Sequence, residues 1–251
     1  MVATLLRNLL VWSLCLGSEV ALAREWLAVG TNFPRVFERS AEGEYRGLSV
    51  SVLRQALATL GDSVRFELHP WARAQYMVEQ GQADILIGPY KTAEREARFA
   101  FSARAFYRDL IVFYGRRDRL PTWYGDYQTL PREPIGVVRG WAYGARFDQA
   151  RPILDLVKVE SVENGLRMLR MGRLLLLASN QRNSLPIILK LGLRDEIVQL
   201  ESPISLEDGY FAFPKRASHD ALREDVDGAL EGMVERGELA RLAKRWQVEV
   251  P

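Results

Sequence analysis

Cysteine is almost absent from this chain of 251 residues, since Cys15 is its single instance. Cys15 lies in an N-terminal stretch that we predict to be removed, so the mature chain has no disulfide and no thiol chemistry. Histidine is nearly as scarce, with His69 and His219 far apart in the sequence. Without a cluster of cysteine and histidine, we expect no metal site.

The chain also has no strong excess of positive or negative charge and no nucleotide-binding motif. The chain has 34 lysine and arginine residues against 32 aspartate and glutamate residues, a net charge of +2, and no basic block. This balance argues against a nucleic-acid partner. No glycine-rich phosphate loop, dinucleotide fingerprint or serine nucleophile elbow occurs, so we expect no cofactor.

A long apolar run is missing, but the N-terminus has the pattern of a secretory signal peptide. Arg7 is the basic element, residues 9–16 are the apolar core, and Ala-Leu-Ala at residues 21–23 is a cleavage site. The core is shorter than the ~20 residues that a membrane span needs, which disfavours the alternative of an anchor. We therefore predict a signal peptide over residues 1–23 and a periplasmic mature protein starting at Arg24.

Short apolar stretches alternate with amphipathic ones along the mature chain, which predicts an α/β fold with crossover helices. The expected strands are residues 26–30, 64–68, 83–88, 107–114, 135–138, 157–159, 174–178 and 210–213. The expected helices start with a Ser49 cap, at Pro70, after Thr92, near Trp141, and at Val162 and Leu185. Two further helices complete the chain, and the first has Leu222, Val226, Leu230 and Met233 on one face. The pattern restarts after residue 126, so each half is expected to build its own α/β unit.

The segment Gly81–Ser102 carries the clearest chemical signal. A buried strand ends in glycine and proline, and Thr92 can cap the helix that follows it. Arg95 lies in the first turn of that helix. Free backbone N–H groups together with a guanidinium form a site for a small anion, above all a carboxylate.

Six segments in the same order resemble the periplasmic solute-binding proteins of the polar amino acid ABC importers. They are FPRVFERSAEGEYRGLSVSVLRQAL, GQADILIGPYKTAERE, IGVVRGWAYG, LRMLRMGR, GYFAFPK and ERGELARLAKRW. Each segment alone is a weak signal, but together they cover nearly the whole mature chain. The string PWARA at residues 70–74 resembles a subgroup of stand-alone secreted domains, which loosens the link to transport.

The resemblance implies a two-lobed type II (Venus flytrap) fold with two hinge crossovers. Lobe one would comprise residues 24–106 plus 215–251, and lobe two residues 107–214. A small-molecule solute would bind in the cleft and be enclosed by closure of the hinge. The implied partner is an ABC importer permease or a membrane sensor, and the protein is expected to be a monomer.

The resemblance also implies the ligand-binding residues. Arg95 matches the arginine that clamps a ligand carboxylate; the alternative is an ion pair with Glu94, Glu96 or another nearby acid. The aromatic residues can either line the cleft or pack in the lobes, Arg73 can face the ligand or the solvent, and Gly140 lets the backbone come close to the ligand. The further expected ligand-binding residues are Phe33, Trp71, Arg73, Tyr90, Thr92, Gly140, Trp141 and Asn180.

Two departures from the family pattern affect the expected ligand. Leu175 and Asn180 stand where the family has aspartates, and the second aspartate pairs with the ligand's α-amino group. An amide carries no charge, so its hold on an ammonium is weaker. The sequence therefore favours a carboxylate-bearing solute over an ordinary zwitterionic amino acid, unless Asn180 serves only to cap the following helix.

A binding protein without catalysis is the leading functional interpretation, because no catalytic constellation accompanies the resemblance. The first alternative is an enzyme on the same scaffold, similar to the cyclohexadienyl dehydratases, which act on prephenate-like acids. Such chemistry needs a carboxylate or another acid–base group in the cleft, for which Glu94, Glu96 and His69 are the candidates. Another alternative is a sensory or interaction module.

Overall fold

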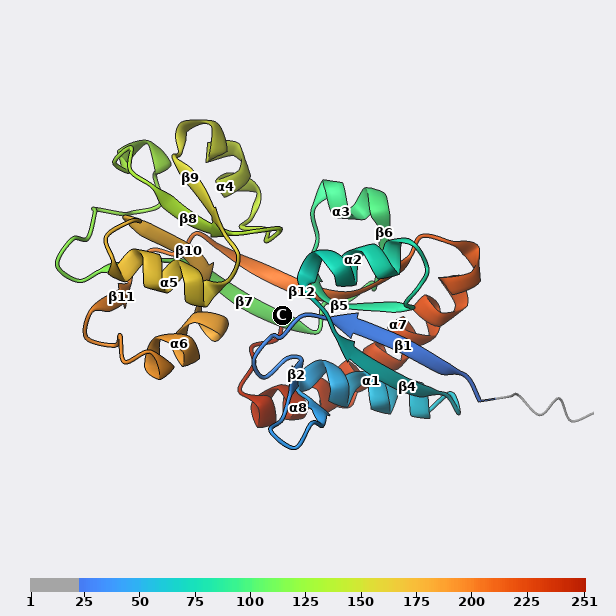
Figure 1. Cartoon of the computed structure of the whole chain (residues 1–251). Helices are drawn as coiled ribbons and strands as arrows, with labels where there is room; N and C mark the ends of the chain where they lie inside the picture. The colour runs from blue at the N-terminus through green and yellow to red at the C-terminus, as the bar shows by residue number, and fades with distance from the viewer. Residues whose placement is uncertain (1–22) are drawn as a thin grey trace, which may run out of the picture.

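The computed structural model describes residues 23–251, so all but the last residue of the predicted signal peptide lies outside the described residues. Two lobes are joined by the long strands β7 (Tyr107–Arg116) and β12 (Ser205–Pro214) (Figure 1). This is the two-lobed α/β fold expected from the sequence. Among the residues described, no helix combines the length and the apolar character that a membrane crossing requires.

One ten-stranded sheet runs through both lobes. The strands besides β7 and β12 are β1 (Glu25–Gly30), β4 (Ser63–Leu68), β5 (Ile85–Tyr90), β6 (Phe99–Phe101), β8 (Ile135–Val138), β9 (Leu156–Val159), β10 (Leu176–Asn180) and β11 (Ile197–Gln199). Their order is β4-β1-β5-β12-β7-β10-β8-β9, with β6 beside β12 and β11 beside β7. β1 pairs in parallel with β4 and β5, and β8 does so with β9 and β10.

The two parallel units meet at the antiparallel pair of β7 and β12. β12 pairs with β5 of lobe one, and β7 pairs with β10 of lobe two. Both strands therefore belong to the two lobes at once. The predicted lobe boundaries at residues 107 and 214 stay a prediction, since each falls at an end of a shared strand.

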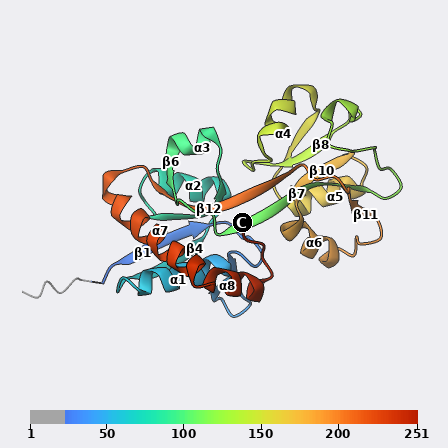
Figure 2. The same ribbon diagram turned by 180° about the vertical axis from the view of Figure 1, so that it is seen from behind.

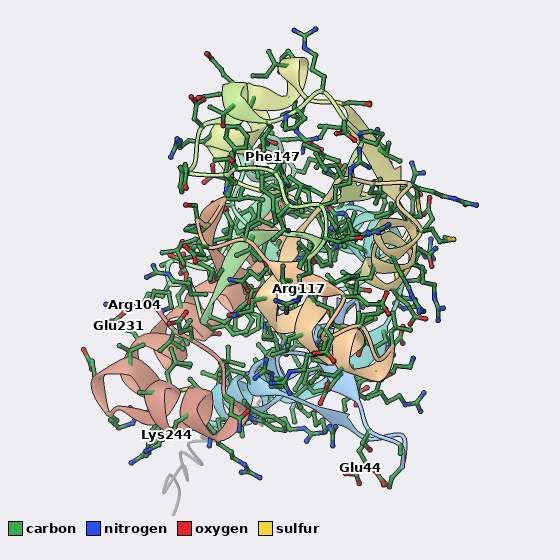
Figure 3. The ribbon with its side chains drawn as sticks, turned by 90° about the vertical axis from the view of Figure 1, so that its left-hand side faces the viewer. Glu44, Arg104, Arg117, Phe147, Glu231 and Lys244 are labelled. Carbon is green, nitrogen blue, oxygen red and sulfur yellow. The ribbon has the colours of Figure 1, made fainter. Side chains whose placement is uncertain are left out.

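Lobe one contains the helices α1 (Leu48–Ala58), α2 (Trp71–Glu79), α3 (Ala93–Arg98), α7 (Asp220–Glu235) and α8 (Glu238–Trp246). The C-terminal pair α7 and α8 packs against α1 (Figure 2). The predicted apolar face of α7 is confirmed, because all four of its residues are buried. On the surface, Arg104 donates to Glu231 of α7 (Figure 3), which ties the loop after β6 to this helix.

Lobe two contains α4 (Ala145–Ala150), α5 (Val162–Arg170) and α6 (Gln181–Lys190). Phe147 of α4 is fully buried and packs near Phe113 of β7 and Tyr143 (Figure 3). A separate apolar cluster forms where α5 and α6 cover β10 and the end of β7. Each lobe thus has helices that bury its own part of the sheet.

Several predicted helix boundaries were wrong for identifiable reasons. Gly47, not Ser49, precedes α1, and the buried Ser49 hydroxyl donates to the Val36 carbonyl at 2.7 Å. The helix expected near Trp141 begins only at Ala145, because Gly144 has a positive φ of 89° and interrupts the backbone. α6 begins at Gln181, four residues before the expected start, where Asn180 caps it.

The sequence analysis also missed short elements. Residues 33–46, expected to be a loop, contain the two-stranded hairpin of β2 (Glu38–Arg39) and β3 (Tyr45–Arg46). The short strands β6 and β11 were not predicted either. β12 starts five residues before its expected start, because its first residues bond to β7 rather than enter the core.

Candidate functional site

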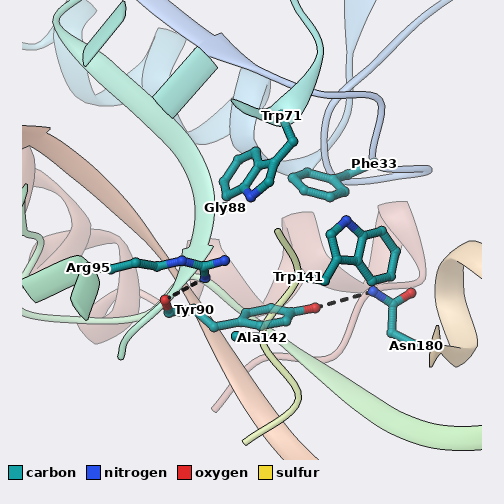
Figure 4. Close-up of a pocket in the computed structure, with 8 residues that line it drawn as sticks. All are labelled: Phe33, Trp71, Gly88, Tyr90, Arg95, Trp141, Ala142 and Asn180. Atoms are coloured by element: carbon teal, nitrogen blue, oxygen red, sulfur yellow. Dashed lines mark hydrogen bonds between the residues drawn. The ribbon is translucent and has the colours of Figure 1, made fainter. Parts of the chain in front are cut away.

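A narrow cavity lies between the two lobes, at the ends of β5 and β10 (Figure 4). The volume open to water-sized spheres is about 20 Å³. That is the space of one or two water molecules, so the lobes are closed on each other. The cavity is lined by Phe33, Trp71, Gly88, Tyr90, Arg95, Trp141, Ala142 and Asn180.

Strand β5 brings Gly88 and Tyr90 to the cavity. Every residue of β5 is buried, as the apolar run predicted. Gly88 has a φ of 83°, and a Cβ there would lie 3.1 Å from the Tyr107 hydroxyl and 3.3 Å from the Phe33 ring. Glycine at this position therefore lets Phe33 pack directly on the strand that carries Tyr90.

Arg95 lies at the start of α3 as the sequence predicted. Thr92 caps the helix and accepts a hydrogen bond from the Arg95 backbone N–H at 3.2 Å. The guanidinium turns into the cavity, where Nη1 donates to the Tyr90 carbonyl and Nη2 to the Gly140 carbonyl, both at 2.9 Å. Only 6% of the residue is exposed, and this burial lowers the pKa of Arg95.

Within residues 23–251, Arg95 forms no ion pair with a carboxylate, although the charges of Glu94 and Glu207 act on it from farther away. Glu94 and Glu96, the acids considered as alternative partners, are exposed on α3, and Glu94 pairs with Arg98 instead. A buried guanidinium without a counter-charge is costly, because carbonyl groups replace only part of its hydration. The site is therefore ready to accept an anion.

Aromatic rings from both lobes form the walls of the cavity. Trp71 begins α2, and Phe33 meets its ring edge-on with the centroids 5.7 Å apart. The Arg95 guanidinium lies 5.6 Å from the centre of the Trp71 ring, a cation–π contact. Trp141, from lobe two, lies opposite these rings and is half-buried (Figure 4).

Gly140 of lobe two bridges the cavity to lobe one. Its carbonyl accepts from Arg95 and also from the Trp71 indole Nε1, the latter at 3.1 Å. Its φ is 75°, and a Cβ there would lie 3.4 Å from the Trp71 ring. A side chain at this position would strain the turn that aims the carbonyl at lobe one. Entry of a solute requires these bonds to open with the hinge.

A second polar cluster lies behind the cavity and was missed by the sequence analysis. Arg182 of α6 donates to both oxygens of Asp109 at 2.9 and 2.6 Å and to the Pro34 carbonyl at 2.7 Å. The Tyr90 hydroxyl donates to Asp109 at 2.7 Å. An aspartate inside the otherwise apolar strand around residue 109 is the signal that could have indicated a buried ion pair.

The electrostatics of this cluster hold it in one ionisation state. Burial and the adjacent Asp109 carboxylate both raise the pKa of Tyr90, so its hydroxyl stays protonated and donates. Burial alone would lower the pKa of Arg182, but the charge and hydrogen bonds of Asp109 raise it above its usual value. Asp109 is thus saturated by three donors from two side chains.

Asn180 connects this cluster to the cavity. Its Nδ2 donates to the Tyr90 hydroxyl at 3.2 Å, and its Oδ1 accepts from the Asn183 backbone N–H at 2.9 Å, which caps α6. The capping role considered in the sequence analysis is present, and Asn180 lines the cavity as well.

The structure does not bring every expected residue to the cavity. Thr92 acts as the cap of α3 and is not among the lining residues. Arg73 is exposed and lies over the Tyr76 ring at 5.6 Å. Among the acid–base candidates, His69 is bonded to Glu67 at 2.9 Å and does not line the cavity.

One further carboxylate lies near the hinge. Glu207 of β12 is half-buried, and this burial raises its pKa. It packs against Gly144 and Ser205 of lobe two and is not a lining residue. Within the described part of the chain, no group of three histidine, cysteine or acidic residues is placed to hold a metal.

A two-lobed sheet with shared hinge strands and a closed interlobe cavity defines a solute-binding protein of the type II fold. The model of the bacterial extracellular solute-binding proteins, family 3, matches residues 27–249, and the chain belongs to this family. The resemblance inferred from the six sequence segments is thereby confirmed.

Solved structures show the same fold at low sequence identity. A histidine kinase sensor domain with similarity to periplasmic binding proteins has a TM-score of 0.80 at 19% identity, covering 91% of this chain and 99% of that chain. An ancestral arginine-binding protein bound to arginine has a TM-score of 0.74 at 17% identity, covering 88% of this chain and 97% of that chain.

A substrate-binding protein of an ABC uptake transporter from Streptococcus pneumoniae with bound histidine also has a TM-score of 0.74, at 15% identity, covering 88% of this chain and 92% of that chain. No curated protein matches the chain significantly.

Proposed function

We propose that the protein captures a small carboxylate-bearing solute, an amino acid or a related compound, in the interlobe cavity and performs no catalysis. The observation that carries the proposal is Arg95, whose buried guanidinium faces the cavity and donates hydrogen bonds to carbonyl groups alone among residues 23–251. An arginine fork matches a carboxylate in two hydrogen bonds, each stronger than a bond to a neutral carbonyl.

The proposed contacts assign one role to each wall. Arg95 holds the carboxylate, while Phe33, Trp71 and Trp141 enclose the body of the solute. Tyr90 and Asn180 form the base of the cavity, and Gly140 closes it from lobe two. In this proposal, lobe one comprises residues 24–106 plus 215–251 and lobe two comprises residues 107–214.

Delivery to an ABC importer permease is the first proposed use of the captured solute, in line with the transporter proteins among the similar structures. The monomeric protein would act in the periplasm after loss of residues 1–23. A sensory role is the second candidate, favoured by the likeness to a histidine kinase sensor domain over almost its full length. In either role, the closed form is the signal that the membrane partner reads.

Replacement of Arg95 tests the proposal. Arg95→Ala is expected to weaken solute binding by about 2–4 kcal/mol, the range for one partner of a desolvated charge pair. Arg95→Lys is expected to lose affinity too, because a point charge cannot reproduce the fork. Calorimetric titration with solutes that co-purify with the native protein measures both effects, and Arg73→Ala is the control on the exposed surface. Equal affinities in all four proteins would refute the proposal.

A further inference from the structure

Two N–H donors in the cavity converge on a single oxygen atom. Arg95 Nη2 and Trp71 Nε1 lie 2.9 and 3.1 Å from the Gly140 carbonyl oxygen. They come from different helices of lobe one, while the oxygen belongs to lobe two. A carboxylate oxygen at this point would receive both hydrogen bonds, and it would bind them more strongly than a neutral carbonyl does.

No acid in the cavity is available for an ammonium group. None of the eight described lining residues is acidic. Asp109, which is bonded to the lining residue Tyr90, already accepts from Arg182 twice and from Tyr90 once. Glu207 packs beside Gly144 outside the lining. An amino group in the closed cavity would lose its water without gaining a counter-ion.

The faces of Trp71 and Phe33 do not substitute for such an acid. Trp71 already has the Arg95 guanidinium over its ring at 5.6 Å, and Phe33 has that of Arg182 at 5.9 Å. A ligand cation on these rings would lie close to one of the two guanidiniums in a site with little water, where like charges repel strongly. An apolar ligand surface is not repelled by these guanidinium groups.

We propose that the solute is a carboxylic acid with an apolar body and no ammonium group, and that one carboxylate oxygen replaces the Gly140 carbonyl between Arg95 and Trp71. This inference rests on the proposed function and narrows its substrate class. Trp71 becomes a specificity-determining residue, because its indole N–H is the second donor to the anion. The Gly140 carbonyl becomes an internal competitor that keeps the ligand-free cleft closed.

Matched ligands that differ only in the amino group test the substrate class. The probes are 3-phenylpropanoate against L-phenylalanine and 4-methylpentanoate against L-leucine, titrated calorimetrically into the mature protein. The acid without the amino group is expected to bind at least ~10-fold more tightly in each pair, a difference of about 1.4 kcal/mol. Tighter binding of the amino acid in both pairs, or no binding of either deaminated acid, would overturn the inference.

Arg95→Ala separates this failure from failure of the proposed function. If the protein binds amino acids and Arg95→Ala weakens that binding, the carboxylate site at Arg95 is supported and only the inference about the ammonium group is refuted. Binding that is insensitive to Arg95 would refute both.

Trp71→Phe tests the second donor, since it keeps an aromatic ring and removes the N–H. We expect affinity for 3-phenylpropanoate to fall by about 3- to 10-fold, because the lost bond to a carboxylate is about twice as strong as the lost bond to Gly140. Trp26→Phe is the matched control, because its indole bonds to Asp62 on the far side of lobe one at 2.8 Å. Thermal unfolding checks that both variants are folded. An unchanged affinity in a folded Trp71→Phe variant would contradict the role of Trp71.

Discussion

The two buried arginines at the cleft are equally shielded from solvent, but Arg182 has a carboxylate partner and Arg95 has no ion-pair partner among the described residues. Arg95 is 6% exposed and Arg182 is 7% exposed, and each lies beside an aromatic ring. Arg182 is bound by both oxygens of Asp109, whereas the hydrogen bonds of the Arg95 guanidinium to described residues go to the carbonyls of Tyr90 and Gly140. Burial lowers the pKa of Arg95, while Asp109 raises that of Arg182.

This difference indicates that the charge of Arg182 stabilises the fold, whereas the charge of Arg95 is available to bind a ligand. A compensated ion pair fixes the junction of β7, α6 and the Pro34 loop. An uncompensated guanidinium costs the ligand-free protein stability, which an incoming anion can restore. The same residue type therefore supports the hinge in one place and prepares the ligand site in the other.

The largest expected effect comes from removing the counter-charge of Arg182. Asp109→Asn should lower the free energy of unfolding by about 3–5 kcal/mol, because it leaves a buried charge unpaired. Arg95→Gln should leave the free energy of unfolding unchanged or raise it, since it removes a buried charge that has no ion-pair partner. Urea denaturation of both variants measures the contrast. Equal losses in the two variants would mean that the arginines do not differ as described.

A smaller effect is expected from placing an acid in the cavity on the side opposite Arg95 (Figure 4). Asn180→Asp keeps the cap of α6 and places a carboxylate in the lining, so affinity for L-phenylalanine should rise by about 10-fold. Asn164→Asp, on the exposed face of α5, is the matched control for added charge. Competition calorimetry measures both affinities. If only stability changes in Asn180→Asp, then Asn180 acts as a cap and does not set specificity.

The sequence predicted the features that depend on neighbouring residues. Thr92 and Arg95 are three positions apart, so their arrangement at a helix start follows from capping rules alone. The buried face of α7 follows from helical periodicity.

The partners of the buried groups could not be predicted in the same way. Asp109 and Arg182 are 73 positions apart, and only the folded sheet brings them together. The role of the Gly140 carbonyl depends on a positive φ that aims it across the cleft. Helix α4 starts at Ala145 rather than near Trp141 because Gly144 interrupts the backbone. The spacing of apolar residues in the sequence does not reveal this interruption.

A crystal structure of the protein with 3-phenylpropanoate is the decisive test of whether Arg95 binds the carboxylate. We expect a carboxylate oxygen about 3 Å from both Arg95 Nη2 and Trp71 Nε1. We also expect that the Gly140 carbonyl has moved off these donors, while the Asp109–Arg182 pair is unchanged. A carboxylate bound at Arg182, or anywhere else with both bonds to Gly140 retained, would refute the role of Arg95.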